Sequence, residues 1–156
     1  MSFLPLNELP ELFPNIEGWV KSLEIQAVSF GKTPLAYHPY ARQAGVELPY
    51  KIHILPVTCI PQPKHPRFAE LAQSIGLLTN ETGGITAGYG ILIRSDCINN
   101  LKLIVHECVH LAQYERLGMT VFLRQYIGQL AESGYKMAQF EIEAEIKSNE
   151  ILKPKP

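Results

Sequence analysis

The feature that most constrains this chain is the stretch LKLIVHECVHLAQY at residues 101–114. Its apolar side chains recur every three or four positions, which predicts an amphipathic α-helix with one face in a hydrophobic core. Asn99 and Asn100 precede this pattern and can cap the start of such a helix. The expected apolar face consists of six residues: Leu101, Ile104, Val105, Cys108, Leu111 and Ala112. His106 and His110 lie on a different side of the helix from this face.

The spacing of the two histidines indicates a metal site. Residues four positions apart lie one above the other on the same side of an α-helix. The rings of His106 and His110 can therefore converge on one ion, at about 2 Å from each coordinating nitrogen. Glu107 points about 100° around the helix axis from His106, beside the ion. A carboxylate there can accept a proton from a water molecule whose pKa the ion lowers.

A catalytic zinc ion needs a third protein ligand and keeps one position open for water. The segment YKMAQFEIEAEIKSNEIL, residues 135–152, predicts a helix that carries three candidate carboxylates. Glu141 is the first choice, because Ala144 on the same side would let this helix pack closely against the histidine helix. Glu145 shares that side and is the second choice, whereas Glu143 points away and is the third. A solvated, glutamate-rich surface helix is the alternative interpretation of this segment.

Composition narrows the class of protein. With 46% hydrophobic residues and a formal net charge of −1, the chain can bury a core and shows no basic cluster for nucleic acid. No window reaches the roughly 20 apolar residues of a membrane span, and residues 1–19 lack the pattern of a signal peptide. Cys59, Cys97 and Cys108 form no close pair, which is typical of a reduced protein. We therefore expect a cytoplasmic protein without nucleic-acid or membrane partners.

The order of the predicted elements indicates a single α+β domain over residues 1–156. We expect N-terminal helices and strands in residues 1–84. Residues 85–152 should hold a strand, the histidine helix and the helix of the third ligand, and residues 153–156 a tail. No parallel β-α-β alternation is evident in the sequence.

Individual elements follow from periodicity and from turn residues. Pro5, Pro10 and Pro14 predict turns before the first helix. The expected elements are a helix over 16–30, a strand over 50–57, a helix near 68–75 and a strand over 85–93. Three glycines divide the C-terminal half into roughly three helices: Gly118, Gly128 and Gly134.

Four segments together resemble the gluzincins, zinc metallopeptidases with a His-Glu-x-x-His helix and a glutamate on a following helix. These segments are ITAGYGILI, HECVHLAQY, FLRQY and GYKMAQFEIEA, and they span residues 85–145. The chain is most similar to the short, minimal gluzincin-like domains. The resemblance implies a zincin-like fold, in which a small sheet has an edge strand along the cleft beside the active-site helix and C-terminal helices.

The resemblance also implies roles for individual residues. His106, His110 and Glu141 become the expected ligands of Zn²⁺, and Glu107 becomes the general base. The segment ITAGYGILI matches the edge strand, whose exposed backbone could pair with an extended peptide substrate. An ordinary internal strand is the alternative for this segment.

These inferences predict a zinc-dependent metallopeptidase that hydrolyses peptide or protein substrates through a metal-activated water, with Glu107 as general base. The alternative is a non-catalytic zinc-bound structural or binding module on the same fold. That alternative is suggested by the short chain, which leaves no long C-terminal subdomain to form a second wall of the cleft. The sequence does not indicate an oligomeric state.

Four other residues receive candidate roles. Tyr126 and Tyr135 are candidate donors to an oxyanion or to a metal ligand. Gln113 could hydrogen-bond a ligand from outside the site, and Cys108 is expected to be a buried thiol. Three isolated histidines receive no role: His38, His53 and His65.

Overall fold

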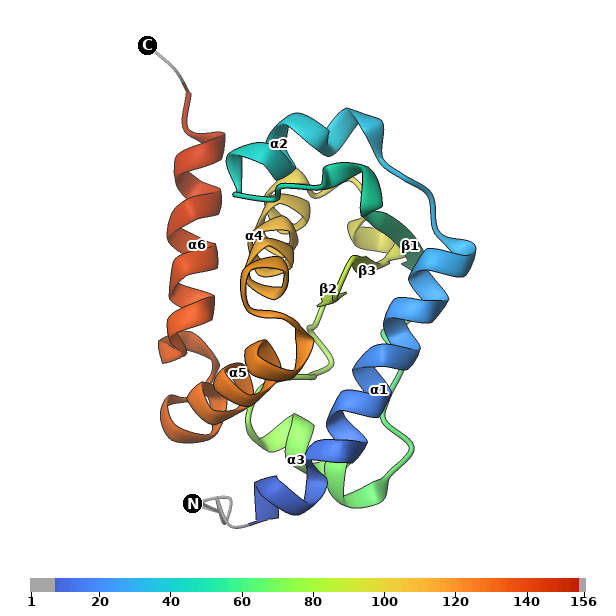
Figure 1. The fold of residues 1–156 in the computed structure, drawn as a ribbon, viewed down its shortest axis with the longest axis vertical. Helices are drawn as coiled ribbons and strands as arrows, with labels where there is room; N and C mark the ends of the chain where they lie inside the picture. The colour runs from blue at the N-terminus through green and yellow to red at the C-terminus, as the bar shows by residue number, and fades with distance from the viewer. Residues whose placement is uncertain (1–7, 155–156) are drawn as a thin grey trace.

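The computed structural model describes residues 8–154, in which helices cover both faces of a small sheet (Figure 1). The described chain contains the α-helices α1 (Leu9–Phe30), α2 (His38–Gln43), α3 (Pro66–Ser74), α4 (Leu101–Leu117), α5 (Met119–Ser133) and α6 (Gln139–Leu152). The strands are β1 (His53–Val57), β2 (Gly84–Ala87) and β3 (Gly90–Arg94). Short 3₁₀ turns lie at Leu35–Tyr37, Pro49–Lys51, Ser95–Cys97 and Tyr135–Met137. The expected mixed α+β class is confirmed.

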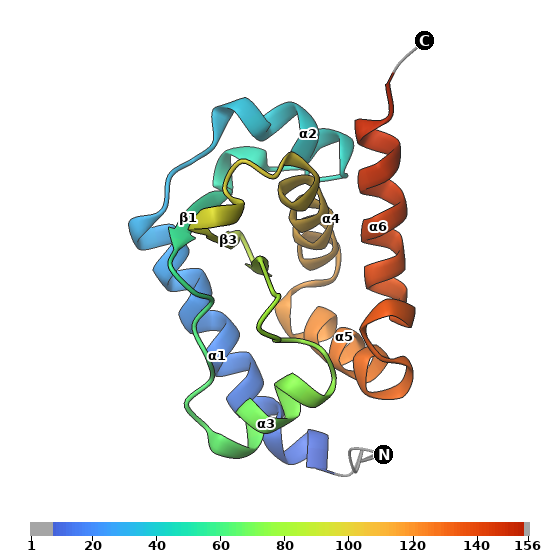
Figure 2. The same cartoon turned by 180° about the vertical axis from the view of Figure 1, so that it is seen from behind.

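The elements stack in layers, in the order α6, α4, sheet and α1, as Figure 1 and the reverse view in Figure 2 both show. Successive side chains of β3 point into two different cores. Ile91 and Ile93 pack in the core that contains α4, whereas Leu92 packs in the core that contains α1. Burial on both faces explains why β3 is an uninterrupted apolar run.

The sheet has the strand order β1-β3-β2. Strand β2 is antiparallel to β3, but β1 is parallel to β3, with His53 opposite Gly90. The sequence shows no parallel β-α-β alternation, and it gave no signal for this parallel pairing of β1 with β3. The connection from β1 to β3 runs through a proline-rich segment, α3 and β2, so the two parallel strands are not neighbours in a simple strand-helix-strand alternation.

Strand β1 is shorter than the expected strand over 50–57, because Pro49–Lys51 form a turn. Pro56 lies inside β1 although proline cannot donate a backbone hydrogen bond. Two residues earlier, the N–H of Ile54 donates to the carbonyl of Lys32, on the side of β1 away from β3. The nitrogen of Pro56 points to that same side, so the pairing of β1 with β3 loses no backbone hydrogen bond.

The expected single strand over 85–93 is wrong: this segment is a hairpin of β2 and β3. Gly88 and Tyr89 form its turn, and Gly88 has a φ of 58°, in the region that favours glycine. A Cβ atom at this position would lie 1.9 Å from Glu24 Oε2. That same oxygen accepts a hydrogen bond from the N–H of Tyr89 at 2.8 Å, so α1 holds the turn in place.

Helix α1 begins at Leu9, earlier than the expected start at residue 16. Pro10 lies in the first turn, where backbone N–H groups have no partner within the helix in any case. Pro14 lies inside the helix and removes one further backbone hydrogen bond. The helix continues through it, because the apolar side chains of this segment are buried against the core. The turns expected at Pro10 and Pro14 are therefore wrong, and Pro5 lies outside the described residues.

Helix α4 is more deeply buried than its pattern predicted. The expected apolar face is buried apart from Leu101, which is partly exposed. The opposite side is buried as well, because β2, α5 and α6 pack against it. That side carries four buried residues: Glu107, His110, Gln113 and Tyr114. Asn100 caps the helix as expected, accepting a hydrogen bond from the N–H of Leu103 at 3.1 Å.

Three helices make up the C-terminal half, as predicted. Gly118 and Gly134 separate them, but Gly128 lies within α5, and the helix continues through it. Helix α6 ends at Leu152, and residues 155–156 of the expected tail lie outside the described residues. Over the described part of the chain, no helix combines the length and apolar character needed to cross a membrane.

Candidate metal centre

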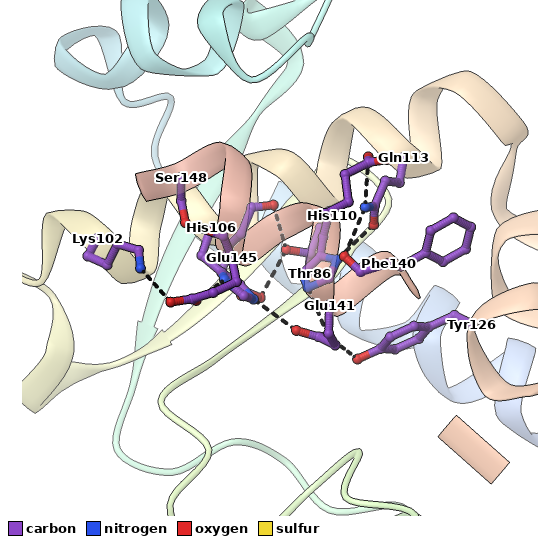
Figure 3. A network of polar contacts seen from close by, with 12 residues as sticks. Thr86, Lys102, His106, His110, Gln113, Tyr126, Phe140, Glu141, Glu145 and Ser148 are labelled. Carbon is purple, nitrogen blue, oxygen red and sulfur yellow. Dashed lines mark hydrogen bonds and ion pairs between the residues drawn. The ribbon is translucent and has the colours of Figure 1, made fainter. Parts of the chain in front are cut away.

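Three side chains from α4 and α6 point at one another beside the sheet (Figure 3). Glu141 Oε1 lies 3.0 Å from His106 Nε2, and Glu141 Oε2 lies 3.0 Å from His110 Nε2. The two imidazole rings are 4.9 Å apart between centroids. The structure thus brings together the three residues that the sequence predicted as ligands.

This arrangement fits a metal ion. The candidate ligand atoms of His106, His110 and Glu141 all lie within 4.8 Å of one another. Ligands of a tetrahedral zinc ion, bound at about 2.0 to 2.1 Å, are roughly 3.3 Å apart, close to the two spacings of 3.0 Å. Two imidazoles and one carboxylate could therefore hold such an ion with only a small adjustment of the side chains.

Gln113 determines which nitrogen of His110 is free to bind a metal. The amide nitrogen of Gln113 donates to the carbonyl of Phe140 and to Glu143 Oε1, both at 3.1 Å. Its oxygen therefore faces His110 Nδ1, at 2.8 Å, and must accept a proton from it. In neutral His110 the proton is then on Nδ1, and the Nε2 lone pair points at the candidate ion position. A hydrogen bond from the other ring nitrogen is the usual support for a histidine ligand. Gln113 thus makes the expected hydrogen bond with His110.

The other two candidate glutamates of α6, Glu143 and Glu145, do not reach the ion position. Glu145 Oε2 lies 3.7 Å from His106 Nδ1, on the far side of the ring from Glu141, and Lys102 pairs with its other oxygen at 3.0 Å. Glu143 accepts the hydrogen bond from Gln113 and points away from the site. Of the three candidates, Glu141 alone lies between the histidine rings.

Charge and hydrogen bonding stabilise the ionised form of Glu141. Burial alone would raise the pKa of this carboxyl, but hydrogen bonds with His106 and His110 outweigh it and hold the pKa well below the usual range. Burial would likewise lower the pKa of His110, yet the facing Glu141 raises it to about 9.

Tyr126 on α5 donates a short hydrogen bond to Glu141 Oε2. Burial, together with the charge of Glu141, raises the pKa of Tyr126 well above its ordinary value, so the phenol keeps its proton. Of its two expected roles, orienting a ligand is the one that this geometry supports. Tyr135 differs, because its ring is 43% exposed and lines the cavity next to the site.

Glu107 points into the same cavity as the candidate ligands and is held by Thr86 on β2. Thr86 Oγ1 lies 3.0 Å from the backbone oxygen of Glu107 and 3.2 Å from its Oε1, so one hydroxyl proton serves both acceptors. This contact leaves Oε2 of Glu107 free for proton transfer. The sequence did not indicate Thr86, because 21 residues separate it from Glu107 and no local motif links them.

The metal centre opens into a cavity of about 640 Å³. Helices α4 and α6 supply its polar side, and strand β2 borders it through Gly84, Ile85 and Thr86. Helix α1, helix α5 and the segment between α3 and β2 supply the remaining walls. The N-terminal half therefore supplies part of the cavity wall, through α1 and the segment before β2.

Strand β2 lies at an edge of the sheet and presents unpaired backbone groups to this cavity. The carbonyl of Gly83 accepts a hydrogen bond from the N–H of Arg94. Hydrogen-bonded pairs alternate along an antiparallel ladder, so Ile85 and Ala87 are the next residues of β2 that hydrogen-bond to β3. The N–H and C=O groups of Gly84 and Thr86 then point away from β3. The expected edge strand beside the site is therefore β2. It corresponds only to the first half of the segment that was predicted as one strand.

Comparisons of the chain with protein-family models, with curated proteins and with solved structures find no match. The likeness to gluzincins thus stays a prediction from the motifs, and the case for the site depends on the geometry described above.

The remaining candidate residues lie away from this centre. Cys108 is buried as expected, and burial raises the pKa of its thiol to about 12. His65 caps α3, because its Nδ1 accepts from the N–H of Phe68. His53 Nδ1 lies 2.9 Å from the carbonyl of Lys51. Neither His65 nor His53 belongs to the group that could hold a metal.

Proposed function

We propose that the chain is a zinc-dependent peptidase in which His106, His110 and Glu141 bind zinc and Glu107 is the general base. The observation that carries the proposal is the convergence of these three ligands at one side of an open cavity that Glu107 also lines. Structural zinc sites are closed by four protein ligands, whereas catalytic sites have three and leave a position for water. The group of three found within the described residues fits the catalytic type.

A zinc ion at this centre would polarise the substrate carbonyl and lower the pKa of the attacking water toward neutrality. Glu107 would accept the proton from that water and later pass it to the departing amine. Thr86 supports this role by holding one oxygen of the carboxylate. Tyr135 lines the same cavity, and its phenolic O–H could donate to the developing negative charge.

The edge of β2 supports a peptide as the substrate. An extended peptide can add to an open strand through backbone hydrogen bonds, which do not depend on its sequence. Gly84 and Thr86 offer such groups directly beside Glu107, whose Cγ would lie 3.5 Å from a Cβ atom at position 84.

The variant Glu107→Gln tests the proposal. It should retain about one zinc per chain and lose hydrolysis of a mixed peptide library by roughly 100- to 10,000-fold, the contribution of a general base. Glu150→Gln, an exposed change of the same kind on α6, is the matched control and should remain active. Hydrolysis by Glu107→Gln at the control rate would rule out this mechanism.

A structural zinc module is the second candidate, because the proposed ligands join α4 to α6. It is favoured if the zinc-loaded protein hydrolyses no peptide in the library and unfolds when a chelator is added. Hydrolysis that disappears with the chelator and returns with zinc would exclude it.

A further inference from the structure

The cavity beside the metal centre has an apolar end that neither the proposed ligands nor the base occupies. Helix α1 contributes uncharged side chains to it, and so does helix α5, in which the hydroxyl of Tyr126 is turned toward Glu141. The apolar lining from the two helices comprises Ile16, Trp19, Val20, Phe122, Leu123 and Ile127. No described residue of α1 or α5 places a charge in this lining.

The charged residues of the cavity, apart from the metal centre and Glu107, are Glu81, Lys102, Lys136 and Glu145. Lys102 and Glu145 pair with each other at 3.0 Å, and Glu81 and Lys136 are exposed. None of these four residues lies on α1 or α5, so a charged ligand group placed against these two helices meets no opposite charge from them. Burying such a group without a partner is costly, so the apolar end selects against it.

Four apolar lining residues are only partly buried, so a ligand can still cover them: Trp19, Leu77, Ile85 and Leu103. Trp19 is held edge-on against Phe68, with ring centroids 5.4 Å apart, and presents a fixed wall. The volume of about 640 Å³ lies in the range of sites that enclose a small organic ligand. The cavity therefore has room for a large side chain next to the metal.

We propose that the substrate carries a bulky apolar side chain adjacent to the bond that is hydrolysed, and that this side chain fills the apolar end of the cavity. This inference rests on the proposed function for the position of the reacting bond. The apolar walls that carry it come from both halves of the chain: α1, the segment around Leu77, Ile85 on β2 and α5.

Binding of small hydroxamates to the zinc-loaded protein tests the inference without requiring turnover. A hydroxamate with an isobutyl or benzyl side chain should bind roughly 10- to 100-fold more tightly than acetohydroxamate, as measured by calorimetry. A hydroxamate with a carboxymethyl side chain should gain nothing over acetohydroxamate. Equal affinity across the series would overturn the inference, and so would a failure of every member to bind.

A matched pair of variants locates the preference. Ile85→Thr changes a lining residue, whereas Ile146→Thr makes the same change on α6, where the side chain is 55% exposed and outside the cavity. Ile85→Thr should reduce the advantage of the isobutyl compound several-fold and leave acetohydroxamate binding unchanged, which also shows that the site is folded. An unchanged advantage in Ile85→Thr would contradict the assignment.

The two proposals fail in different ways. Peptide hydrolysis without any preference among the hydroxamates would leave the peptidase and remove the apolar selectivity. A clear preference with no hydrolysis of any peptide would remove the peptidase and leave the ligand class.

Discussion

At the scale of single residues, Glu141 is the point on which the metal centre depends. Each of its oxygens faces a histidine nitrogen, and Tyr126 donates to one of them. Buried carboxylates that lose a partner are destabilised, because the remaining charge is less well compensated. Loss of a group that hydrogen-bonds Glu141 should therefore lower the zinc affinity, which can be measured.

Tyr126→Phe should weaken zinc binding by roughly 10- to 100-fold, the range for loss of a hydrogen bond to a metal ligand. The ring stays in place, because it stacks with Phe122 at a centroid distance of 5.3 Å. Competition with a chelating dye measures the change. Tyr135→Phe is the control and should keep the affinity; equal affinities in the two variants would contradict the role of Tyr126.

Thr86→Val should retain zinc and lower kcat by roughly 10- to 100-fold, because Glu107 loses the donor that orients it. Thr86→Ser keeps the hydroxyl and should restore most of the rate. Steady-state kinetics on one peptide and zinc content together provide the check. A serine variant as slow as the valine variant would indicate a packing defect in place of lost orientation.

The residues of the site were predictable to different degrees. His106, Glu107 and His110 could be found because their positions follow from the pitch of one helix. Glu141 could only be ranked above Glu143 and Glu145, since its choice depends on how two helices pack. The sequence contains no signal for Thr86, whose contact with Glu107 joins a strand to a helix.

At the scale of elements, the close packing of α1 on the sheet depends on Gly90. A Cβ atom there would lie 2.7 Å from the Cβ of Ala27 and 3.3 Å from the Cα of Glu24. Neither atom can move without displacing α1. The helix, the hairpin turn and one wall of the cavity are therefore coupled through this contact.

Gly90→Ala should lower the free energy of unfolding by about 1 to 3 kcal/mol, the usual cost of overpacking. Gly128→Ala should act in the opposite direction and stabilise by up to about 1 kcal/mol. Gly128 lies inside α5, where an added Cβ meets nothing within 4 Å. Urea denaturation of both variants gives the comparison, and a shift of the same sign in both would contradict this account of Gly90.

The helices were easier to predict than the sheet. Helix α4 follows from a regular apolar period, although the burial of its second side depends on β2, α5 and α6. The hairpin was missed because Gly-Tyr is a weak turn signal inside an apolar run. The pairing of β1 with β3 joins segments about 37 positions apart, as His53 lies opposite Gly90, and local periodicity carries no information on it.

At the scale of the whole molecule, the candidate ion would join the two helices that pack most extensively, α4 and α6. An ion that binds only the folded chain adds about 2.7 kcal/mol of stability when its free concentration is 100 times Kd. Removing zinc with a chelator should then lower Tm by roughly 5 to 10 °C for a chain of this size.

Calorimetric scans with and without chelator measure this difference. His106→Ala should show no response to the chelator, because it lacks one ligand. A wild-type Tm that does not change with zinc or chelator would count against a metal at this centre.

The cavity could not be predicted from the sequence, because its walls come from segments that lie far apart in the chain. Trp19, Ile85 and Leu123 all line it, although long stretches of sequence separate them. Their own periodicity indicates only that they face inward. Which inward-facing residues leave a space, and which fill it, is decided when α1 and α5 pack around the sheet.

The placement of β2 also bears on self-association. An exposed strand edge usually allows the sheets of two molecules to join, and proteins must guard against this. Here the outer edge of β1 is blunted by Lys32 and Pro56, and the opposite edge lies along a confined hollow. A single extended chain can enter such a hollow, whereas the flank of another folded molecule is too broad. If a peptide pairs with β2 as proposed, the recess that receives it also works against edge-to-edge aggregation.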